Sequence, residues 1–301
     1  MQRKIKDLCK LFKTTYTEWL GRDPFRQSAV IAYYAIFSIP GLLVLIINII
    51  GSFYTKDAAS QSILAQVSKI MGVETAKQIE EILVSVSASK SSMWTSIFGV
   101  IILVVGSTGV FVELQKTLNQ IWQVKVTTKS GIWPIIKARL FSFGLILAIA
   151  FLLLISLVVS SLLAAISNLI NFETSGFMST ISTIINFLLS LSIISTLFAL
   201  IFKILPDAKI KWKHVWLGSV VTGILFELGK TALAFYFAKA NPTSTYGAAG
   251  SIILILLWVS YSSMILFFGA EFTATYALFY SGEVAPTKIA KPDHSHQTKV
   301  K

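Results

Sequence analysis

Long runs of apolar residues dominate the pattern of hydrophobic and polar positions along this chain. Each run exceeds the ~18 residues at which a membrane-spanning helix becomes the default interpretation of an apolar stretch. The pattern therefore predicts an all-α fold, a polytopic membrane helix bundle with six transmembrane helices. The predicted spans lie near residues 29–50, 93–112, 141–168, 181–202, 215–238 and 249–270.

The segments outside these runs are amphipathic or polar. Residues 1–28 contain a basic amphipathic helix, which is expected to lie flat on the anionic head groups of the inner leaflet. Docking on the cytoplasmic face of the bundle is an equal alternative for this helix. The six-span membrane domain covers 29–280, and within it 51–92 is expected to form an external amphipathic cap. The polar tail, 281–301, contains proline and is expected to be a disordered cytoplasmic segment.

Positive charge is concentrated on one side of this predicted topology. The chain carries a formal net charge of +12, although only 13% of its residues are charged. With a cytoplasmic N-terminus, 20 Lys and Arg residues lie in cytoplasmic segments and 5 in external ones, as the positive-inside rule requires. The distribution predicts that both termini are cytoplasmic, and it accounts for the excess charge without a nucleic-acid partner. The single Cys9 lies in the basic N-terminal segment and is expected to stay reduced in the cytosol.

The fifth predicted span carries an acidic and a basic residue near its middle. Glu227 and Lys230 are three residues apart, and therefore share one face of a helix. A charged side chain at this depth costs at least ~2.5–3.5 kcal/mol, so the pair is expected to face the bundle or water. Gly223 and Ala234 extend the same face into a stripe of small and charged residues. The pair either locks two helices together or belongs to a pathway for an ion, a proton or a solute.

Aromatic and polar residues in other spans are candidates for the lining of such a pathway. The residues predicted to line a cavity are Tyr33, Tyr34, Asn186, Trp258 and Tyr261. Pro40 lies near the centre of the first span, where it removes a backbone hydrogen bond and kinks the helix. This kink is either structural or a gating hinge.

No motif of an enzyme or a metal site is recognisable in the sequence. It has no phosphate-binding glycine loop, no cysteine pair and no His-Glu-x-x-His helix. The histidines, His214, His294 and His296, do not have the spacing of a metal site. Glu113 and Glu271 lie at the predicted cytoplasmic rim, where acids usually act as caps or loop anchors. We therefore expect no catalytic residue, no metal and no cofactor.

Six strings of the sequence resemble the YihY/virulence factor BrkB family. They are AYYAIFSIPGLL, LQKTLNQIWQV, LPDAKIKW, LFELGK, YGAAGSIILILLWVSY and GAEFTATYA, in the family's order. The resemblance implies a six-helix integral protein of the bacterial cytoplasmic membrane. Some members carry the label ribonuclease BN, but that chemistry requires metal ligands or paired histidines, which the sequence lacks. The residues that the resemblance assigns to family motifs are Pro40, Pro206, Asp207, Tyr246, Gly247 and Glu271.

Two functional hypotheses of different classes fit these observations. The leading one is a transporter-like protein that moves an ion, a lipid or a small amphiphile, with Glu227 contacting a cation or proton and Lys230 as its counter-charge. The alternative is a non-transporting membrane scaffold that recruits partners or organises lipids, in which the pair is structural. Membrane lipids are expected partners in either case. Small residues at Gly106 and Gly109 favour close helix packing, either in an oligomer or inside the monomer.

Overall fold

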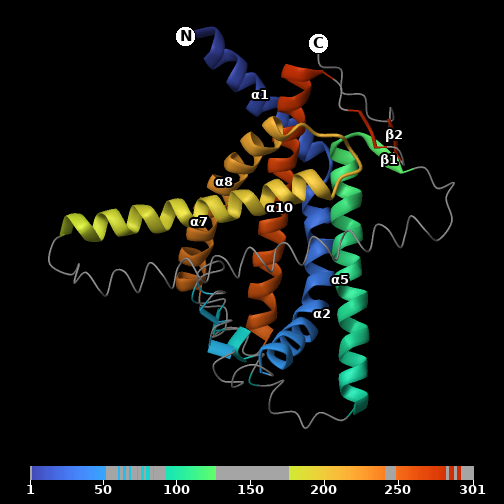
Figure 1. Ribbon diagram of the computed structural model, residues 1–301, viewed down its shortest axis with the longest axis vertical. Helices are drawn as coiled ribbons and strands as arrows, with labels where there is room; N and C mark the ends of the chain where they lie inside the picture. The colour runs from blue at the N-terminus through green and yellow to red at the C-terminus, as the bar shows by residue number, and fades with distance from the viewer. Residues whose placement is uncertain are drawn as a thin grey trace. The chain divides into compact units, whose positions relative to one another are not determined.

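The computed structural model describes residues 2–51, 93–126, 176–240, 249–282, 285–287 and 290–292, together with scattered residues between 60 and 84. This part of the chain is mostly helical (Figure 1). The helices are α1 Gln2–Gly21, α2 Pro24–Gly51, α5 Met93–Ile121, α7 Gly176–Ile204, α8 Trp212–Ala240 and α10 Ala249–Ser281. The strands are β1 Val124–Val126 and β2 Ala290–Pro292, which pair in an antiparallel fashion.

Five predicted spans fall inside helices α2, α5, α7, α8 and α10. The other predicted span, 141–168, lies outside the described residues, as does most of the predicted external cap. Within three of the helices, the stretches Phe187–Ile204, Trp212–Phe237 and Ile252–Ser281 are long and apolar enough to cross a membrane.

Two helices continue well beyond their predicted spans, because hydropathy marks only the apolar part of a helix. α5 runs on to Ile121 and α10 to Ser281. Glu113 and Glu271 therefore lie inside helices, and the expectation that these acids cap helix ends is wrong. The side chain of Glu271 is buried.

The described chain divides into two compact units. The first comprises residues 1–21, 115–225 and 266–301, and the second comprises 22–114 and 226–265. Helices α5, α8 and α10 each contribute one part to each unit.

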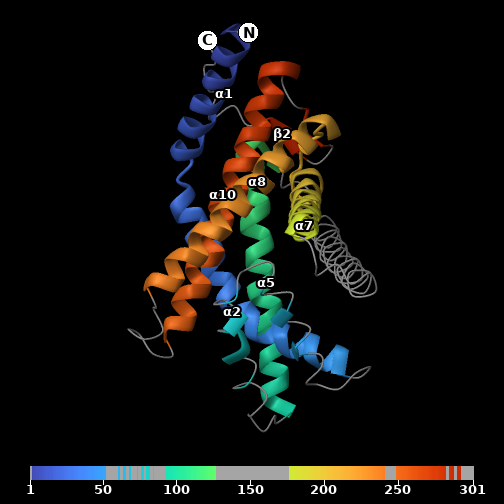
Figure 2. The ribbon, with the colours of Figure 1, turned by 90° about the vertical axis from the view of Figure 1, so that its left-hand side faces the viewer.

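In the second unit, α2 begins at a proline that follows a residue with positive φ. Asp23 has φ 56°, and its carbonyl accepts a hydrogen bond from the backbone N–H of Gln27. The carboxylate of Asp23 accepts a bond from Nε of Arg26 at 2.9 Å. Proline is preferred at the first helical position because its missing N–H would have no intrahelical partner there. The helix stays α-helical through Pro40, and Figures 1 and 2 show that it changes direction in its second half.

α2 packs closely on α5 in the same unit. A Cβ atom added at Gly109 would overlap the ring of Tyr34, and one at Gly106 would lie 3.0 Å from the Tyr34 carbonyl oxygen and 3.1 Å from Ser38. These two glycines therefore pack inside the monomer, which was one of the two alternatives that the sequence left open.

In the first unit, α8 and α10 approach each other through a reciprocal arrangement of glycine and threonine. A Cβ at Gly218 of α8 would overlap the Thr273 hydroxyl of α10, and a Cβ at Gly269 of α10 would overlap the Thr222 hydroxyl of α8. Each threonine donates its hydroxyl hydrogen to the carbonyl of the glycine one turn earlier in its own helix, at 2.6 Å for Thr222 and 2.7 Å for Thr273. Small residues thus allow two helix backbones to approach, while the buried hydroxyls remain hydrogen-bonded.

α1 packs on α10 along one face. Leu11 and Thr15 are buried, and the Trp19 ring meets Phe268 edge-on at 5.7 Å between centroids. The helix therefore docks on the protein, although several of its large apolar residues remain exposed. The large apolar residues exposed on α1 are Leu8, Phe12, Tyr16 and Leu20.

The small sheet ties the tail to the end of α5. Cross-strand partners are Val124 and Pro292, Lys125 and Lys291, and Val126 and Ala290. A second short pairing joins Ala208 to Pro286. The prediction that the whole tail from 281 onward is disordered is therefore wrong for 285–287 and 290–292. Backbone pairing with other segments stabilises these residues, and a low-hydropathy sequence does not reveal such pairing.

Candidate functional site

The charge pair Glu227 and Lys230 lies within α8. The Nζ atom of Lys230 is 2.6 Å from Oε2 of Glu227, and the side chains are 19% and 9% exposed, respectively. The two residues lie on the same helix, and their i, i+3 spacing brings the two charged groups together. The backbone carbonyl of Glu227 also accepts the hydroxyl of Thr231 at 3.0 Å. The ion pair is therefore short, largely buried and local to one helix.

Tyr261 and Trp258 of α10 pack against residues of α8 that are close to this pair in sequence. A Cβ at Gly229 would overlap the hydroxyl oxygen of Tyr261, so the tyrosine side chain reaches the α8 backbone between Glu227 and Lys230 in sequence. Trp258 meets Phe226 edge-on at 6.0 Å. These two aromatic residues were among those predicted to line a cavity, and the structure places both against α8, at Gly229 and Phe226.

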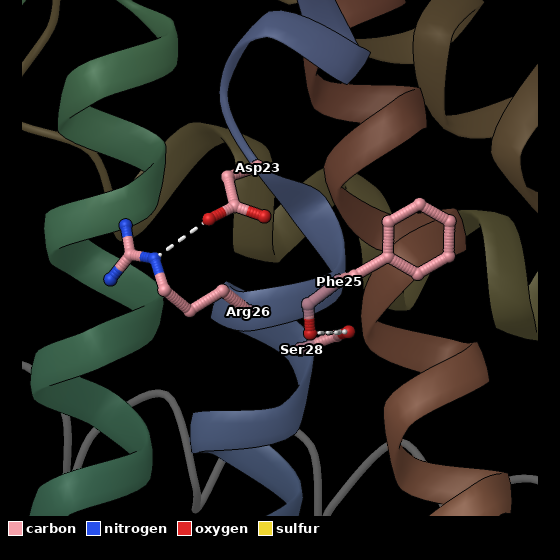
Figure 3. Close-up of polar contacts among 4 residues, drawn as sticks. All are labelled: Asp23, Phe25, Arg26 and Ser28. Carbon is pink, nitrogen blue, oxygen red and sulfur yellow. Dashed lines mark hydrogen bonds and ion pairs between the residues drawn. The ribbon is translucent and has the colours of Figure 1, made fainter.

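The first turns of α2 contact the same part of α10. The hydroxyl of Ser260 donates to the hydroxyl of Ser28 at 3.2 Å. Ser28 in turn donates to the carbonyl of Phe25 at 3.0 Å (Figure 3). These two hydroxyls form a polar contact between α2 and α10 that the sequence did not reveal.

The remaining predicted residues lie elsewhere. Tyr34 packs on the α5 glycines, whereas Tyr33 is 58% exposed and contacts the Phe37 ring at 5.0 Å between centroids. Asn186 lies within α7, but its side chain is outside the described residues, as are Tyr246 and Gly247. In the predicted stripe of small and charged residues, Gly223 and Glu227 are buried, whereas Ala234 is exposed.

In the first unit, Asp207 is the centre of a buried polar cluster that was not predicted from the sequence. Its Oδ2 accepts the side-chain amide of Asn119 at 2.9 Å and that of Gln115 at 3.1 Å. Its backbone N–H donates to Oδ1 of Asn119 at 2.8 Å, so Asn119 and Asp207 form a reciprocal pair. The carbonyl of Asp207 accepts the N–H of Thr287 at 3.0 Å. One residue therefore joins the end of α5, the link between α7 and α8, and the tail.

The link between α7 and α8 makes further contacts of this kind. Lys203 donates from Nζ to the carbonyl of Ile210, and its ammonium lies 5.6 Å from the Trp212 ring centroid. His214 shares a 2.9 Å hydrogen bond with the hydroxyl of Ser281, the last residue of α10. Pro206 is buried beside Asp207. The ends of α7, α8 and α10 thus meet through polar groups.

The sequence contained a signal for this cluster. Gln115 and Asn119 are four residues apart, and therefore lie on the same face of α5 just beyond its apolar run. They belong to the string LQKTLNQIWQV, and Asp207 belongs to LPDAKIKW, two of the strings that carry the family resemblance. The sequence did not predict the contact between these side chains, because Asn119 and Asp207 are 88 residues apart in the chain.

Neither cluster has the composition of a metal centre. No group of three or more His, Cys, Asp and Glu side chains comes together among the described residues in a way that could hold a metal ion.

The long apolar helices and the ion pair buried in one of them define a helical membrane protein. The family model described as "Virulence factor BrkB" matches residues 15–293, and the chain belongs to this family. This confirms the resemblance that the six strings indicated.

Curated relatives of this chain are described as membrane proteins. A UPF0761 membrane protein of Saccharophagus degradans is 24% identical over 271 residues, which are 90% of this chain and 60% of that protein. One from Pseudoalteromonas atlantica is 26% identical over 280 residues, 91% of this chain and 88% of that protein. One from Verminephrobacter eiseniae is 27% identical over 209 residues, 48% of its length. The chain thus spans between about half and nine-tenths of these relatives. No solved structure matches it.

Proposed function

We propose that this protein is a transporter-like, multi-pass protein of the bacterial cytoplasmic membrane that moves an ion, a lipid or a small amphiphile. The observation that carries the proposal is the buried Glu227–Lys230 pair within the apolar helix α8. Charged residues inside membrane helices are costly, and they mark ion, proton or substrate paths more often than other residues do. The protein acts without covalent chemistry in this proposal and is not an enzyme.

The pair acts as the switch for transport in this proposal. Protonation of Glu227, or contact of its carboxylate with a cation, would weaken its attraction for the Lys230 ammonium. That ammonium would then attract an anionic group, such as a lipid phosphate, more strongly. Tyr261 lies against the backbone between the two charges, and its movement would therefore accompany any rearrangement of the pair. Coupled charge release of this kind is a common basis of proton and ion relays in membrane proteins.

We expect flux through reconstituted protein to require both charges. Proteoliposomes would be assayed for proton flux with an internal pH-sensitive dye, and for translocation of fluorescent phosphatidylglycerol by dithionite quenching. At least one of these activities should exceed that of empty vesicles and fall to background in both Glu227→Gln and Lys230→Met. Lys239→Met is the matched control, because Lys239 lies in the last turn of the same helix and is exposed.

The outcomes of this assay separate transport from the alternative. Flux that survives both substitutions in folded protein removes the pair from the mechanism. If the wild type shows neither proton flux nor lipid translocation, and both variants melt at a lower temperature than the wild type, the non-transporting scaffold is favoured. The close packing of Gly229 on Tyr261 and of Phe226 on Trp258 is the observation that supports this second candidate, because it is what a structural lock requires.

We also propose that the N-terminus is cytoplasmic and that α1 rests on the inner leaflet. The exposed apolar residues of α1 and its exposed lysines, Lys6, Lys10 and Lys13, support a helix that lies at an anionic surface.

The single cysteine of the chain allows a direct test of this orientation. Cys9 lies on α1, and it is exposed and free. A membrane-impermeant maleimide should label it in inside-out vesicles and leave it unlabelled in right-side-out vesicles. Detergent-solubilised protein gives the full signal, and Cys9→Ser gives the blank. Labelling restricted to right-side-out vesicles would reverse the proposed topology.

A further inference from the structure

Two lysines face each other directly across the small sheet. Lys125 of β1 and Lys291 of β2 are register partners, and both side chains are exposed. Side chains of directly opposed residues in an antiparallel pair project from the same face, with Cβ atoms about 4.5–5.5 Å apart. The neighbouring residues Val124 and Ala290 are buried, as expected if they point to the opposite face. The outer face of the sheet therefore presents two ammonium groups side by side.

This arrangement is unfavourable for the sheet by itself. Like charges directly opposite each other destabilise a strand pair, and a sheet of two three-residue strands has few other contacts to offset the repulsion. Within the described part of the chain, neither lysine forms an ion pair with a carboxylate. An anion between the two ammonium groups would convert the repulsion into attraction.

We propose that Lys125 and Lys291 bind the phosphate of an anionic phospholipid head group. The tail segment that supplies Lys291 also pairs with the link before α8, through Ala208 with Pro286 and through the N–H of Lys209 with the carbonyl of Ala285. That link leads directly into Trp212, where the membrane-crossing stretch of α8 begins. The sheet is thus connected to the level at which a membrane helix meets the head groups.

The residues just before and at the start of α8 are also typical of the lipid head-group region. Trp212 is 48% exposed, and exposed tryptophan at a helix end is typical of the head-group region. Lys209, Lys211 and Lys213 are also exposed, and add positive charge along the same link. Basic clusters next to membrane helices bind anionic lipids. We therefore expect anionic lipid head groups to be the most abundant anions near Lys125 and Lys291.

Lipid binding at this site would hold the tail in place. Neutralising the lysine pair strengthens the pairing of β1 with β2, and β2 belongs to the same tail segment that contacts Asp207 through Thr287. The anionic lipid would therefore stabilise the packing of the tail on the ends of the helices. This inference does not depend on transport by the Glu227–Lys230 pair.

The test compares lipid retention and thermal unfolding of the full-length protein in neutral detergent. Phosphatidylglycerol should raise the melting temperature of the wild type, whereas phosphatidylcholine should not, and native mass spectrometry should detect bound phosphatidylglycerol. Each lysine near an anionic surface contributes enough for about a fivefold change in affinity, so Lys125→Gln/Lys291→Gln should bind phosphatidylglycerol at least several-fold more weakly. Lys239→Gln, at the far end of α8, is the matched control and should behave as wild type.

A charge reversal provides the sharpest variant. Lys291→Glu places opposite charges across the strands, so this variant should melt higher than the wild type without lipid and gain little when phosphatidylglycerol is added. An equal gain from phosphatidylglycerol in wild type, double glutamine and charge-reversed protein would overturn the proposal. A gain from inorganic phosphate as large as that from phosphatidylglycerol would also overturn it, since the site would then bind free anions.

A measurement on the unmodified protein guards against variants that fail to fold. Hydrogen exchange in nanodiscs should be slower at the amides of Lys125 and Lys291 with phosphatidylglycerol than with phosphatidylcholine. Equal protection in the two lipids would contradict the proposed site.

Discussion

Gly218→Ala is expected to lower the free energy of unfolding of the purified protein by about 1–3 kcal/mol, with Gly269→Ala costing a similar amount. The added methyl group would overlap the hydroxyl of the threonine on the facing helix, and that hydroxyl is held by a hydrogen bond to its own helix. Neither threonine can rotate away without breaking this bond, so the backbones of α8 and α10 have to separate. Thermal unfolding in detergent, followed by near-UV circular dichroism, measures the loss.

The reciprocal geometry supplies its own controls. Gly218→Ala/Thr273→Gly moves the missing side chain from one helix to the other, and should recover part of the lost stability despite the ~1 kcal/mol cost of a glycine inside a helix. Gly21→Ala is the matched single substitution, because a Cβ at Gly21 meets nothing within 4 Å. A Gly218→Ala protein as stable as Gly21→Ala would show that α8 and α10 are not in this close contact.

This contact bears on the proposed transport mechanism because α8 carries the charge pair. α10 provides both Thr273, which faces Gly218, and Tyr261, which faces Gly229. Two points of close backbone approach along one helix pair limit the relative movement of the helices. The proposed transport cycle would therefore have to move α8 and α10 together or break one of these contacts.

The sequence was sufficient to predict those features that depend on local composition. Apolar runs located the helices, and the i, i+3 spacing placed Glu227 against Lys230 because both lie on one helix. In each of these cases, the residues that determine the feature are close neighbours in the chain.

The features that escaped prediction depend on residues far apart in the sequence. Asp207 was assigned to a family motif, but the amides that bind it lie 88 and 92 residues earlier. The tail was expected to be disordered because its composition is polar, although backbone pairing with β1 requires no apolar side chain. Tyr33 and Tyr34 are adjacent and were given one role, yet successive residues on a helix point about 100° apart, and only Tyr34 packs on α5.

Asp207→Ala is expected to destabilise the protein by about 2–4 kcal/mol, because it leaves the buried Asn119 amide and the partly buried Gln115 amide without an acceptor. Asp207→Asn should cost much less. Both amides donate to the same oxygen, Oδ2, and the carbonyl oxygen of an asparagine can take its place. Thermal unfolding of the two variants gives the comparison, with Asp7→Ala on the exposed side of α1 as the control.

The difference in stability between Asp207→Ala and Asp207→Asn shows whether the cluster depends on hydrogen-bond geometry or on the carboxylate charge. If hydrogen-bond geometry is what counts, the exchange Asn119→Asp/Asp207→Asn should restore most of the stability lost in Asn119→Asp, since the side-chain bond is kept with donor and acceptor reversed. Proteolysis of the tail should follow the same order, because Thr287 is hydrogen-bonded to the carbonyl of Asp207 and moves with it. An Asp207→Asn protein as unstable as Asp207→Ala would show instead that the carboxylate charge is required, and that Asp207 balances a positive charge as well as positioning the tail.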